Sequence, residues 1–185
     1  MTKPALDFDR LFPEAALITD QRLREQVEAV WQELWQMSPW PSIEEVPSSP
    51  DFPYPHVRHN RSVLAMALAV ADAFERFHDV RVDRDVLVAA GLLQDASKMV
   101  EYCPGEDGRP AYSELGKLYP HGFLGAHIAL KLGVPDTICH VILEHTPQSP
   151  RFPQPLEGKI LYYVDQLDVI AIHKDRWRKE IFITK

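Results

Sequence analysis

Hydrophobic residues recur every three or four positions in two long stretches of the chain, which is the spacing of one face of an α-helix. The first stretch follows Thr19 or Asp20, either of which can cap the helix start, and runs to about Met37. Its stripe consists of Leu23, Val27, Val30, Trp31 and Leu34. The second stretch covers residues 59–77, with a stripe of His59, Val63, Met66, Val70, Phe74 and Phe77. Both stretches are predicted to be helices that bury one side.

A third stretch, residues 83–99, is apolar nearly all round, which predicts a buried central helix. Gly91 in its middle costs about 1 kcal/mol of helix propensity, and it would let a neighbouring segment come close. Further helices are predicted over residues 122–132, 135–145 and 156–176, and no strand of good quality precedes the short IFIT stretch near the end. The predicted fold is an all-α bundle of six or seven helices with an N-terminal helical arm.

The 16 prolines divide the chain unevenly. Residues 38–55 are rich in proline and serine and are predicted to be a connector. We therefore expect an N-terminal arm, helix and connector over residues 1–50 and a helical domain over residues 51–185. Trp31, Trp35 and Trp40 lie in or just after the first helix; they either pack this arm onto the bundle or form a surface for a homodimer or another partner.

The composition narrows the class of protein. The formal net charge is −7 and the isoelectric point is about 5.6, whereas proteins that bind nucleic-acid backbones are usually basic, so we expect no nucleic-acid partner. The apolar runs are too short to cross a bilayer, and the acidic residues of the N-terminus do not fit a signal peptide. Cys103 and Cys139 are far apart and without metal-type spacing. A cytoplasmic protein without a membrane partner is expected.

Gln94 and Asp95 raise a question, because an amide and a carboxylate end a stretch that otherwise fits a core. A buried ionised carboxylate is costly unless it has a partner. Other segments also direct polar residues toward apolar faces: His59, His121, His145 and Asp165. Each alone is more often a hydrogen-bonded core residue, but convergent His and Asp side chains in a helical bundle are how proteins hold divalent metals. The sequence therefore predicts a metal as the partner of Asp95.

The remaining histidines are expected outside this site. His78, His127, His140 and His173 lie off the apolar faces or in charged stretches, and His56, which follows Pro55, is expected just outside its helix. Glu101, Tyr102 and Tyr119 are candidates for the mouth of a pocket.

The order of His59, Gln94–Asp95 and Asp165 resembles the HD superfamily of metal-dependent phosphohydrolases. Members of that family carry a His, then a His-Asp doublet, then a later Asp. The helix with the first His is similar to HNRSVLAMALAVADAF here, and the helix with the doublet is similar to LVAAGLLQDASK. HGFLGAHIALKLGV, ILEHTPQSP and LEGKILYYVDQLD are similar to bacterial members that cleave symmetric diadenosine tetraphosphate. The resemblance covers residues 56 to 172 and leaves the first 50 unplaced. It implies one ion held by His59, Asp95 and Asp165, and a second ion bridged by Asp95 and held by His121 and His145.

The chain departs from the family pattern at Gln94, where members have His. A Gln amide oxygen is a weaker ligand than imidazole for iron, manganese or zinc. Three outcomes are open: Gln94 ligates through its oxygen with a changed metal preference, only the ion near His121 and His145 is bound, or the site is empty and not catalytic. The expected cofactor is one or two divalent ions, with Fe or Mn favoured over Zn, Ni, Co or Mg.

The resulting expectation is a hydrolase of a nucleotide or another phosphate ester that uses metal-activated water. The resemblance gives Lys98 a phosphate-facing role, so Asp95 and Lys98 are the expected catalytic residues. Lys98, Arg61 and Arg109 are the expected contacts to a small phosphorylated substrate. The alternatives are a di-iron oxygenase of the same superfamily and a degenerate, non-catalytic binding module.

Overall fold

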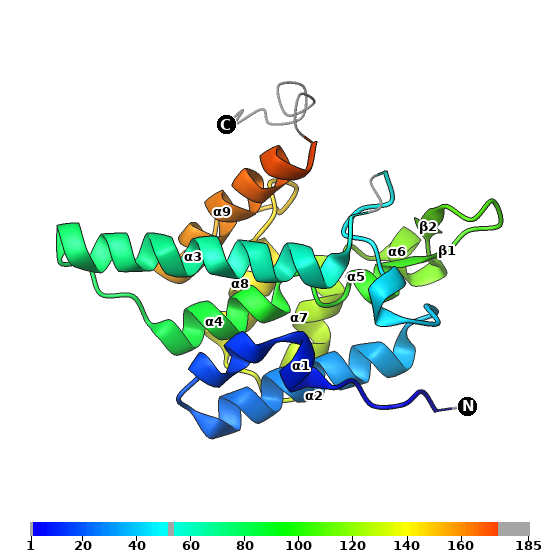
Figure 1. Cartoon of the computed structure of the whole chain (residues 1–185), viewed down its shortest axis with the longest axis horizontal. Coiled ribbons are helices and arrows are strands. Elements are labelled where there is room, and N and C mark those ends of the chain that lie inside the picture. Colours follow the sequence, from blue (N-terminus) through cyan, green and yellow to red (C-terminus); the bar gives the residue numbers. More distant parts are fainter. Residues whose placement is uncertain (1, 52–53, 174–185) are drawn as a thin grey trace.

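The computed structural model describes residues 2–51 and 54–173, and within them the fold is all-α (Figure 1). The six helices of nine or more residues are α2 (Gln21–Met37), α3 (His56–His78), α4 (Arg84–Leu93), α7 (His121–Lys131), α8 (Asp136–Glu144) and α9 (Leu156–His173). Asp20 caps α2, because its side chain accepts a hydrogen bond from the backbone N–H of Leu23. The expectation of a helical bundle is confirmed.

Short elements fill the connections between these helices. They are α1 (Phe8–Leu11), α5 (Lys98–Glu101), α6 (Glu114–Leu118), the 3₁₀ turns Pro13–Leu17 and Ile43–Glu45, and the strands β1 (Tyr102–Pro104) and β2 (Pro110–Tyr112). The strands pair antiparallel, with Tyr102 opposite Tyr112. This hairpin was missed by the sequence analysis, because three-residue strands that contain proline carry no alternating pattern. The IFIT stretch at residues 181–184 lies outside the described residues, and so do the last three residues of the helix expected to reach 176.

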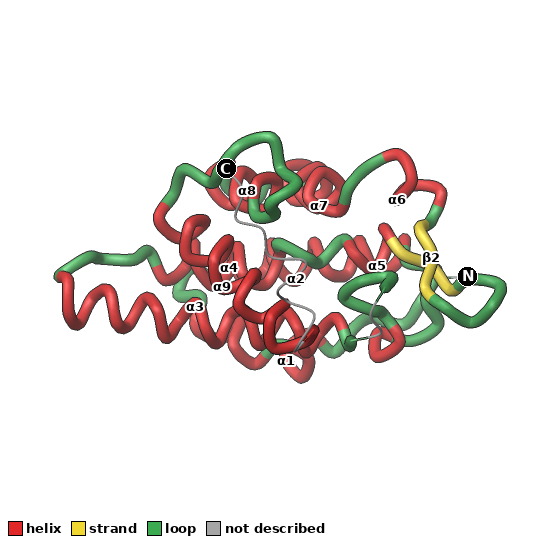
Figure 2. Tube along the Cα trace, turned by 90° about the horizontal axis from the view of Figure 1, so that it is seen from above, coloured by secondary structure: helices red, strands yellow, loops and turns green. Residues whose placement is uncertain are grey.

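Helix α4 lies at the centre of the bundle, where it contacts α2, α3, α8 and α9 (Figure 2). Its residues 87–93 are all buried. At Gly91 a Cβ atom would lie 3.1 Å from Leu64 Cδ1 and 3.3 Å from Leu161 Cδ2. The glycine predicted to permit a close approach therefore does so, and the neighbours that approach are α3 and α9.

The central helix is shorter than predicted. It ends at Leu93, and residues 94–97 form turns that lead into the single turn of α5. The backbone bonds there span three residues, from Ala96 N–H to the Leu93 carbonyl and from Lys98 N–H to the Asp95 carbonyl. The Asp95 carbonyl also accepts a hydrogen bond from His56 Nε2 at 2.8 Å. No proline or glycine marks this break, so the pattern alone did not reveal it, and Asp95 lies in a turn instead of a helix.

The N-terminal region packs on the bundle through its tryptophans, which are all buried. The indole N–H of Trp31 donates to the carbonyl of Leu92 at 3.0 Å, and that of Trp40 donates to the carbonyl of Tyr102 at 2.9 Å. The indole of Trp35 bonds to the carbonyl of Pro4 within the arm. These residues belong to the same hydrophobic core as α4. Packing, and not a free partner surface, therefore explains the tryptophans; the domain boundary at residue 50 and the homodimer stay predictions.

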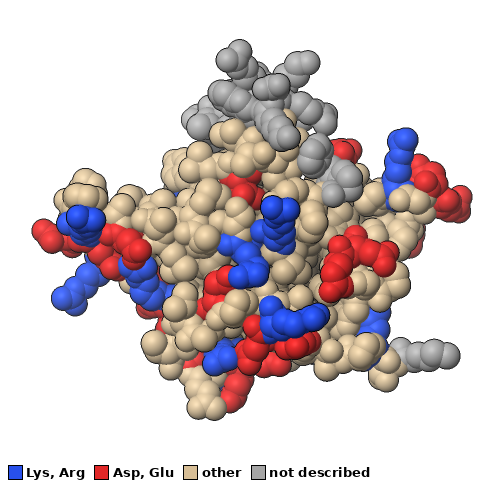
Figure 3. Space-filling model, in the orientation of Figure 1, with Lys and Arg blue, Asp and Glu red and all other residues tan. Residues whose placement is uncertain are grey.

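The surface and the helix lengths add two observations. Acidic and basic side chains are interspersed on the face shown in Figure 3, with no large patch of a single sign. Within the described part of the chain, no helix combines the length and the apolar character needed to cross a membrane.

Candidate metal centre

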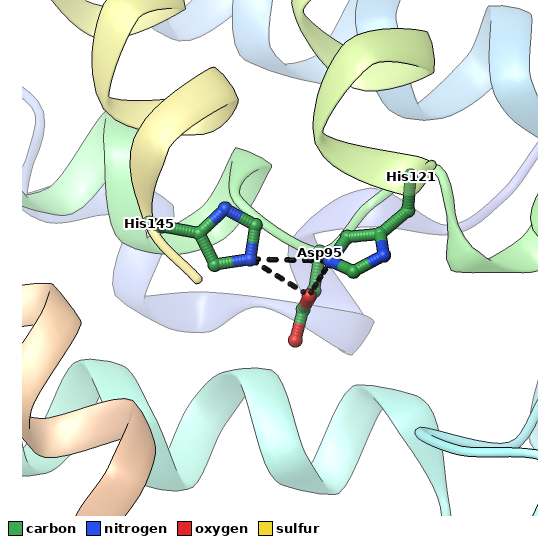
Figure 4. Close-up of side chains that lie close together, drawn as sticks. All are labelled: Asp95, His121 and His145. Atoms are coloured by element: carbon green, nitrogen blue, oxygen red, sulfur yellow. Dashed lines mark hydrogen bonds and ion pairs between the residues drawn. The ribbon is translucent and has the colours of Figure 1, made fainter. Parts of the chain in front are cut away.

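The carboxylate of Asp95 is the meeting point of the predicted ligands. Asp95 is fully buried. Its Oδ1 atom lies 3.3 Å from Nε2 of His121 and 3.2 Å from Nε2 of His145 (Figure 4). The two imidazole nitrogens lie 3.3 Å from each other. One oxygen of Asp95 thus faces a pair of histidines that come from α7 and from the end of α8.

The other oxygen of Asp95 faces a second group of residues. Oδ2 lies 2.9 Å from Nε2 of His59, on α3, and 2.9 Å from Nζ of Lys98. The same His59 nitrogen lies 3.2 Å from Oδ1 of Asp165, on α9. In each of the two groups, one ligand atom per residue lies within 4.8 Å of the others, as a shared metal ion requires. Asp95 belongs to both groups.

All three histidines of the cluster are held in the same way. The Nδ1 atom of His59 bonds to Asp168 Oδ2 at 2.6 Å, that of His121 to Glu101 Oε2 at 3.0 Å, and that of His145 to the carbonyl of Ile142 at 2.7 Å. Because these partners accept hydrogen bonds, Nδ1 carries the proton and Nε2 is the atom left to face the cluster. Metal-binding histidines are typically fixed by such an outer hydrogen bond. The donor set therefore fits a divalent metal ion.

The fold brings His121 and His145 together at two helix ends. His121 is the first residue of α7, and His145 follows the last residue of α8. A Cβ atom on Gly122 would lie 3.1 Å from the carbonyl oxygen of Ile142, so the absence of a side chain there allows the start of α7 to lie against the end of α8.

The cluster strongly perturbs its own ionisable groups. Burial lowers the pKa of His121, but hydrogen bonds to Asp95 and Glu101 outweigh it and raise the pKa to about 9. The pKa of His59 is likewise raised, because bonds to three aspartates outweigh burial. Burial raises the pKa of Asp95, but the charge of Lys98 and the histidine contacts outweigh it and hold that pKa well below its usual value. Asp95 is therefore ionised, with cations around it.

The cluster forms the floor of a pocket of about 540 Å³. His59, Asp95, Lys98, His121, His145 and Asp165 line the floor. The walls come from Ser48–Ser49, Tyr102, the segment Thr146–Gln148 and one side of α9. Its volume falls in the range of about 300–1,000 Å³ common for small-molecule sites. Tyr102 thus lines the pocket, as expected of it.

Gln94 lies beside Asp95 in the chain but is not among the residues that line the pocket. Its side chain is fully buried, and neither Nε2 nor Oε1 has a hydrogen-bond partner among the described residues. An unpaired buried amide costs about 1–3 kcal/mol. The unpaired amide of Gln94, at the position where the resembled family has histidine, therefore needs a chemical explanation.

Two of the expected substrate contacts lie elsewhere. The guanidinium of Arg61 is bonded to Glu14 at 2.6 Å and 2.8 Å on the outer side of α3. Arg109 lies in the hairpin turn with its side chain 85% exposed. Neither lines the pocket, so neither is placed to bind a substrate there. Position 61 is two residues after His59, which places it on another side of the helix.

Several residues of the site were missed or misjudged in the sequence analysis. Asp168 was not singled out, although its spacing of three from Asp165 puts both on one face of α9. Glu101 was expected at the mouth but binds both the ring and the backbone N–H of His121. His56 was expected outside its helix but is the first residue of α3. Tyr119 does not line the pocket and stacks on Phe123.

The chain has a relative among the curated proteins. The chain is similar to the dihydroneopterin 2′,3′-cyclic phosphate phosphodiesterase of Methanocaldococcus jannaschii, with 30% identity over 132 residues. The aligned part is 69% of this chain and 53% of the relative, so the chain spans about half the length of the protein it matches. No family model and no solved structure matches the chain with significance. By its name, this relative cleaves a cyclic phosphodiester.

Proposed function

We propose that this chain is a metal-dependent phosphohydrolase of the HD type that cleaves a phosphate ester of a small nucleotide-like molecule. The observation that carries the proposal is the position of Asp95, whose two carboxylate oxygens face two separate groups of ligands. A carboxylate shared between two ions is a recurrent part of two-metal hydrolytic sites. The similarity to a cyclic phosphate phosphodiesterase supports the same class of reaction.

In this proposal His59, Asp95 and Asp165 hold one ion, and Asp95, His121 and His145 hold the other. Such ions polarise a phosphoryl oxygen and make a water molecule acidic enough to act as a nucleophile near neutral pH. Imidazole and carboxylate donors suit iron or manganese and admit Zn, Ni or Co, whereas Mg²⁺ prefers oxygen ligands alone. Gln94 is the candidate for an additional oxygen ligand, because its amide is buried without another partner.

The two halves of the site are not equivalent. Lys98 shares Oδ2 of Asp95 with His59, so an ion on that side would share the oxygen with an ammonium group. Among the described residues, no lysine or arginine contacts Oδ1, the oxygen that faces His121 and His145. We therefore propose that the His121–His145 side binds its ion more tightly.

Lys98 is the proposed contact to the phosphate. Burial lowers its pKa, but the charges of Asp95 and Asp165 outweigh this and raise it, so Lys98 is a cation at neutral pH. It lies on the pocket floor next to the ligands. From there its ammonium can bind a phosphoryl oxygen and offset the negative charge that develops when water adds to phosphorus.

The charge of the pocket favours a substrate with few phosphates. Lys98 is the only lysine or arginine among the described residues that line it. Beyond the proposed ions, one lysine leaves the outer phosphates of diadenosine tetraphosphate without a protein cation, whereas a cyclic phosphodiester carries only one negative charge. In a cyclic diester, water adds to phosphorus, one P–O bond breaks, and the leaving oxygen takes up the proton, which leaves a phosphate monoester.

The test combines metal analysis with a substrate panel. The protein is purified without chelator, its metals per chain are measured, and it is assayed with adenosine 2′,3′-cyclic phosphate, diadenosine tetraphosphate and a phosphomonoester. Chelator-treated protein, and the same protein reloaded with Mn²⁺, Fe²⁺ or Zn²⁺, are the controls. We expect metal-dependent cleavage of the cyclic diester above the other two. Absence of metal after reloading would favour the non-catalytic module, and oxygen consumption without phosphate-ester cleavage would favour the oxygenase.

A further inference from the structure

The pocket has two chemically different parts. Its floor carries the ionised cluster around Asp95, whereas its wall on α9 carries aromatic and aliphatic side chains. Tyr162 belongs to this wall and is half-buried. It precedes Asp165 by three residues on α9, so the two side chains are neighbours on one face of the helix. An aromatic ring therefore lies one helical turn from the proposed metal centre.

The ring of Tyr162 is held in place by two other aromatic rings. Phe152 packs against it edge-on, with ring centroids 4.9 Å apart and an interplanar angle of 70°. Tyr163 also packs edge-on, at 5.5 Å and 85°. Phe152 does not line the pocket and therefore acts as a support for Tyr162 from outside it. A ring fixed in this way loses little conformational entropy when it binds a ligand.

Polar groups accompany this ring. Gln166 and Gln148 line the same pocket, from α9 and from the segment that follows His145. The amide N–H of Gln166 donates to Asp165 Oδ2 at 3.2 Å. Amide side chains can each donate and accept hydrogen bonds, as the edge of a heterocyclic base requires. The wall thus offers an aromatic face for stacking and amide groups that can form hydrogen bonds with the edge of a base. Among the described residues, no lysine or arginine belongs to this wall.

We infer that Tyr162 forms a subsite that stacks on the flat ring system of the substrate while its phosphate lies on the cluster around Asp95. The inference rests on the proposed function and adds the part of the substrate that the cluster does not explain. Lys98 and the cluster account only for binding of the phosphate, whereas stacking of a base on an aromatic side chain contributes about 1–3 kcal/mol. The substrate class is therefore a phosphodiester that carries a planar heterocycle.

A pair of substrates isolates this contact. Adenosine 2′,3′-cyclic phosphate and ethylene phosphate share the five-membered cyclic diester, and only the first carries a planar base. For Tyr162→Ala we expect KM for the nucleotide to rise roughly 10- to 100-fold with kcat within about threefold. The value of kcat/KM for ethylene phosphate is expected to stay unchanged, and Tyr162→Phe is expected to behave like the unsubstituted protein. An equal loss on both substrates, or no loss on either, would overturn the inference.

A binding measurement separates this inference from the proposed function. Adenosine 3′-monophosphate and glycerol phosphate are titrated into the metal-free protein and into the Tyr162→Ala and Leu118→Ala variants; Leu118 is 71% exposed on α6 and serves as the control. We expect Tyr162→Ala to weaken binding of the nucleotide by roughly tenfold or more and to leave glycerol phosphate unaffected. If the protein cleaves no phosphodiester but shows this pattern, the proposed function fails and the subsite stands. If Tyr162→Ala binds the nucleotide as the unsubstituted protein does, or if that protein binds none, the subsite fails.

Discussion

Asp168 accepts a hydrogen bond from Nδ1 of His59 at 2.6 Å and so fixes the ring with Nε2 directed at Asp95. Ser62 donates to the other oxygen of the same carboxylate at 2.5 Å. Outer partners of this kind change metal affinity by about 10- to 100-fold when removed. We expect Asp168→Ala to lower metal affinity by that factor, and Asp168→Asn, which keeps an acceptor, to lower it less. Titration with Mn²⁺ measures both, and unchanged affinity would refute a positioning role.

Asp95 is the ligand common to both groups, so its removal should affect both ions. We expect Asp95→Ala to reduce bound metal to well below one ion per chain, as measured by elemental analysis after purification without chelator. Asp107→Asn, in the exposed hairpin turn, is the matched control and should keep the metal content of the unsubstituted protein. If Asp95→Ala retains its metal, the proposed centre is wrong.

Gln94 occupies the position where the HD pattern has histidine. If its buried amide lies next to an ion, Gln94→His should replace a weak ligand with a strong one. We expect tighter binding of Mn²⁺ or Fe²⁺ by about tenfold or more, or a higher rate of hydrolysis. Competition with a chromogenic chelator measures the affinity. No change in either quantity would show that this side chain does not ligate.

Metal binding should release protons near neutral pH. The pKa of His121 is raised to about 9 and that of His59 is also raised, so in the metal-free protein both rings are protonated at pH 7. A ligating Nε2 must lose its proton. Metal affinity is therefore expected to increase as the pH is raised toward about 9 and to decrease as the pH is lowered from that value. Calorimetry in two buffers of different ionisation enthalpy measures the protons released at pH 7. A value near zero would contradict the raised pKa values.

Trp31 connects the N-terminal region to the turn that carries Asp95. Its indole N–H is bonded to the carbonyl of Leu92, three residues before Asp95. Trp31→Phe keeps an aromatic ring but leaves that buried carbonyl unpaired, which costs about 1–3 kcal/mol. We expect the free energy of unfolding to fall by at least this amount, as measured by urea denaturation. Trp35→Phe is the comparison, because the indole of Trp35 bonds to the carbonyl of Pro4 within the arm. This second variant should leave metal binding unchanged.

The sequence was informative where a periodic pattern determined the structure. The start of α2 follows from its cap at Asp20. The inward faces of α3, α8 and α9 follow from apolar spacing, and they bring His59, His145 and Asp165 inside the bundle. The resemblance to the HD superfamily supplied the grouping of these residues around Asp95. The structure brings these side chains within the distances that a shared ion requires, and the binding of ions there stays a proposal.

Other features depend on tertiary contacts that no local pattern encodes. The turn at residues 94–97 is formed by three-residue backbone bonds and by the contact with His56, which is 39 positions away in the chain. Arg61 was expected to bind substrate, but its ion-pair partner Glu14 lies in the arm, for which the resemblance offered no guide. Charged residues near a motif in sequence therefore predicted the site poorly, because helix rotation decides which of them face it.

Gly91 has a consequence for the spacing of the proposed ligands. It allows α3 and α9 to lie close against α4, and these are the helices that carry His59 and Asp165. The facing atoms of His59 and Asp165 lie 3.2 Å apart, and their helices pack on α4 through Leu64 and Leu161 at Gly91. A methyl group at this position would lie 3.1 Å from Leu64 Cδ1 and 3.3 Å from Leu161 Cδ2, so these two side chains would have to give way. The spacing of the proposed metal ligands thus depends in part on a residue that has no side chain.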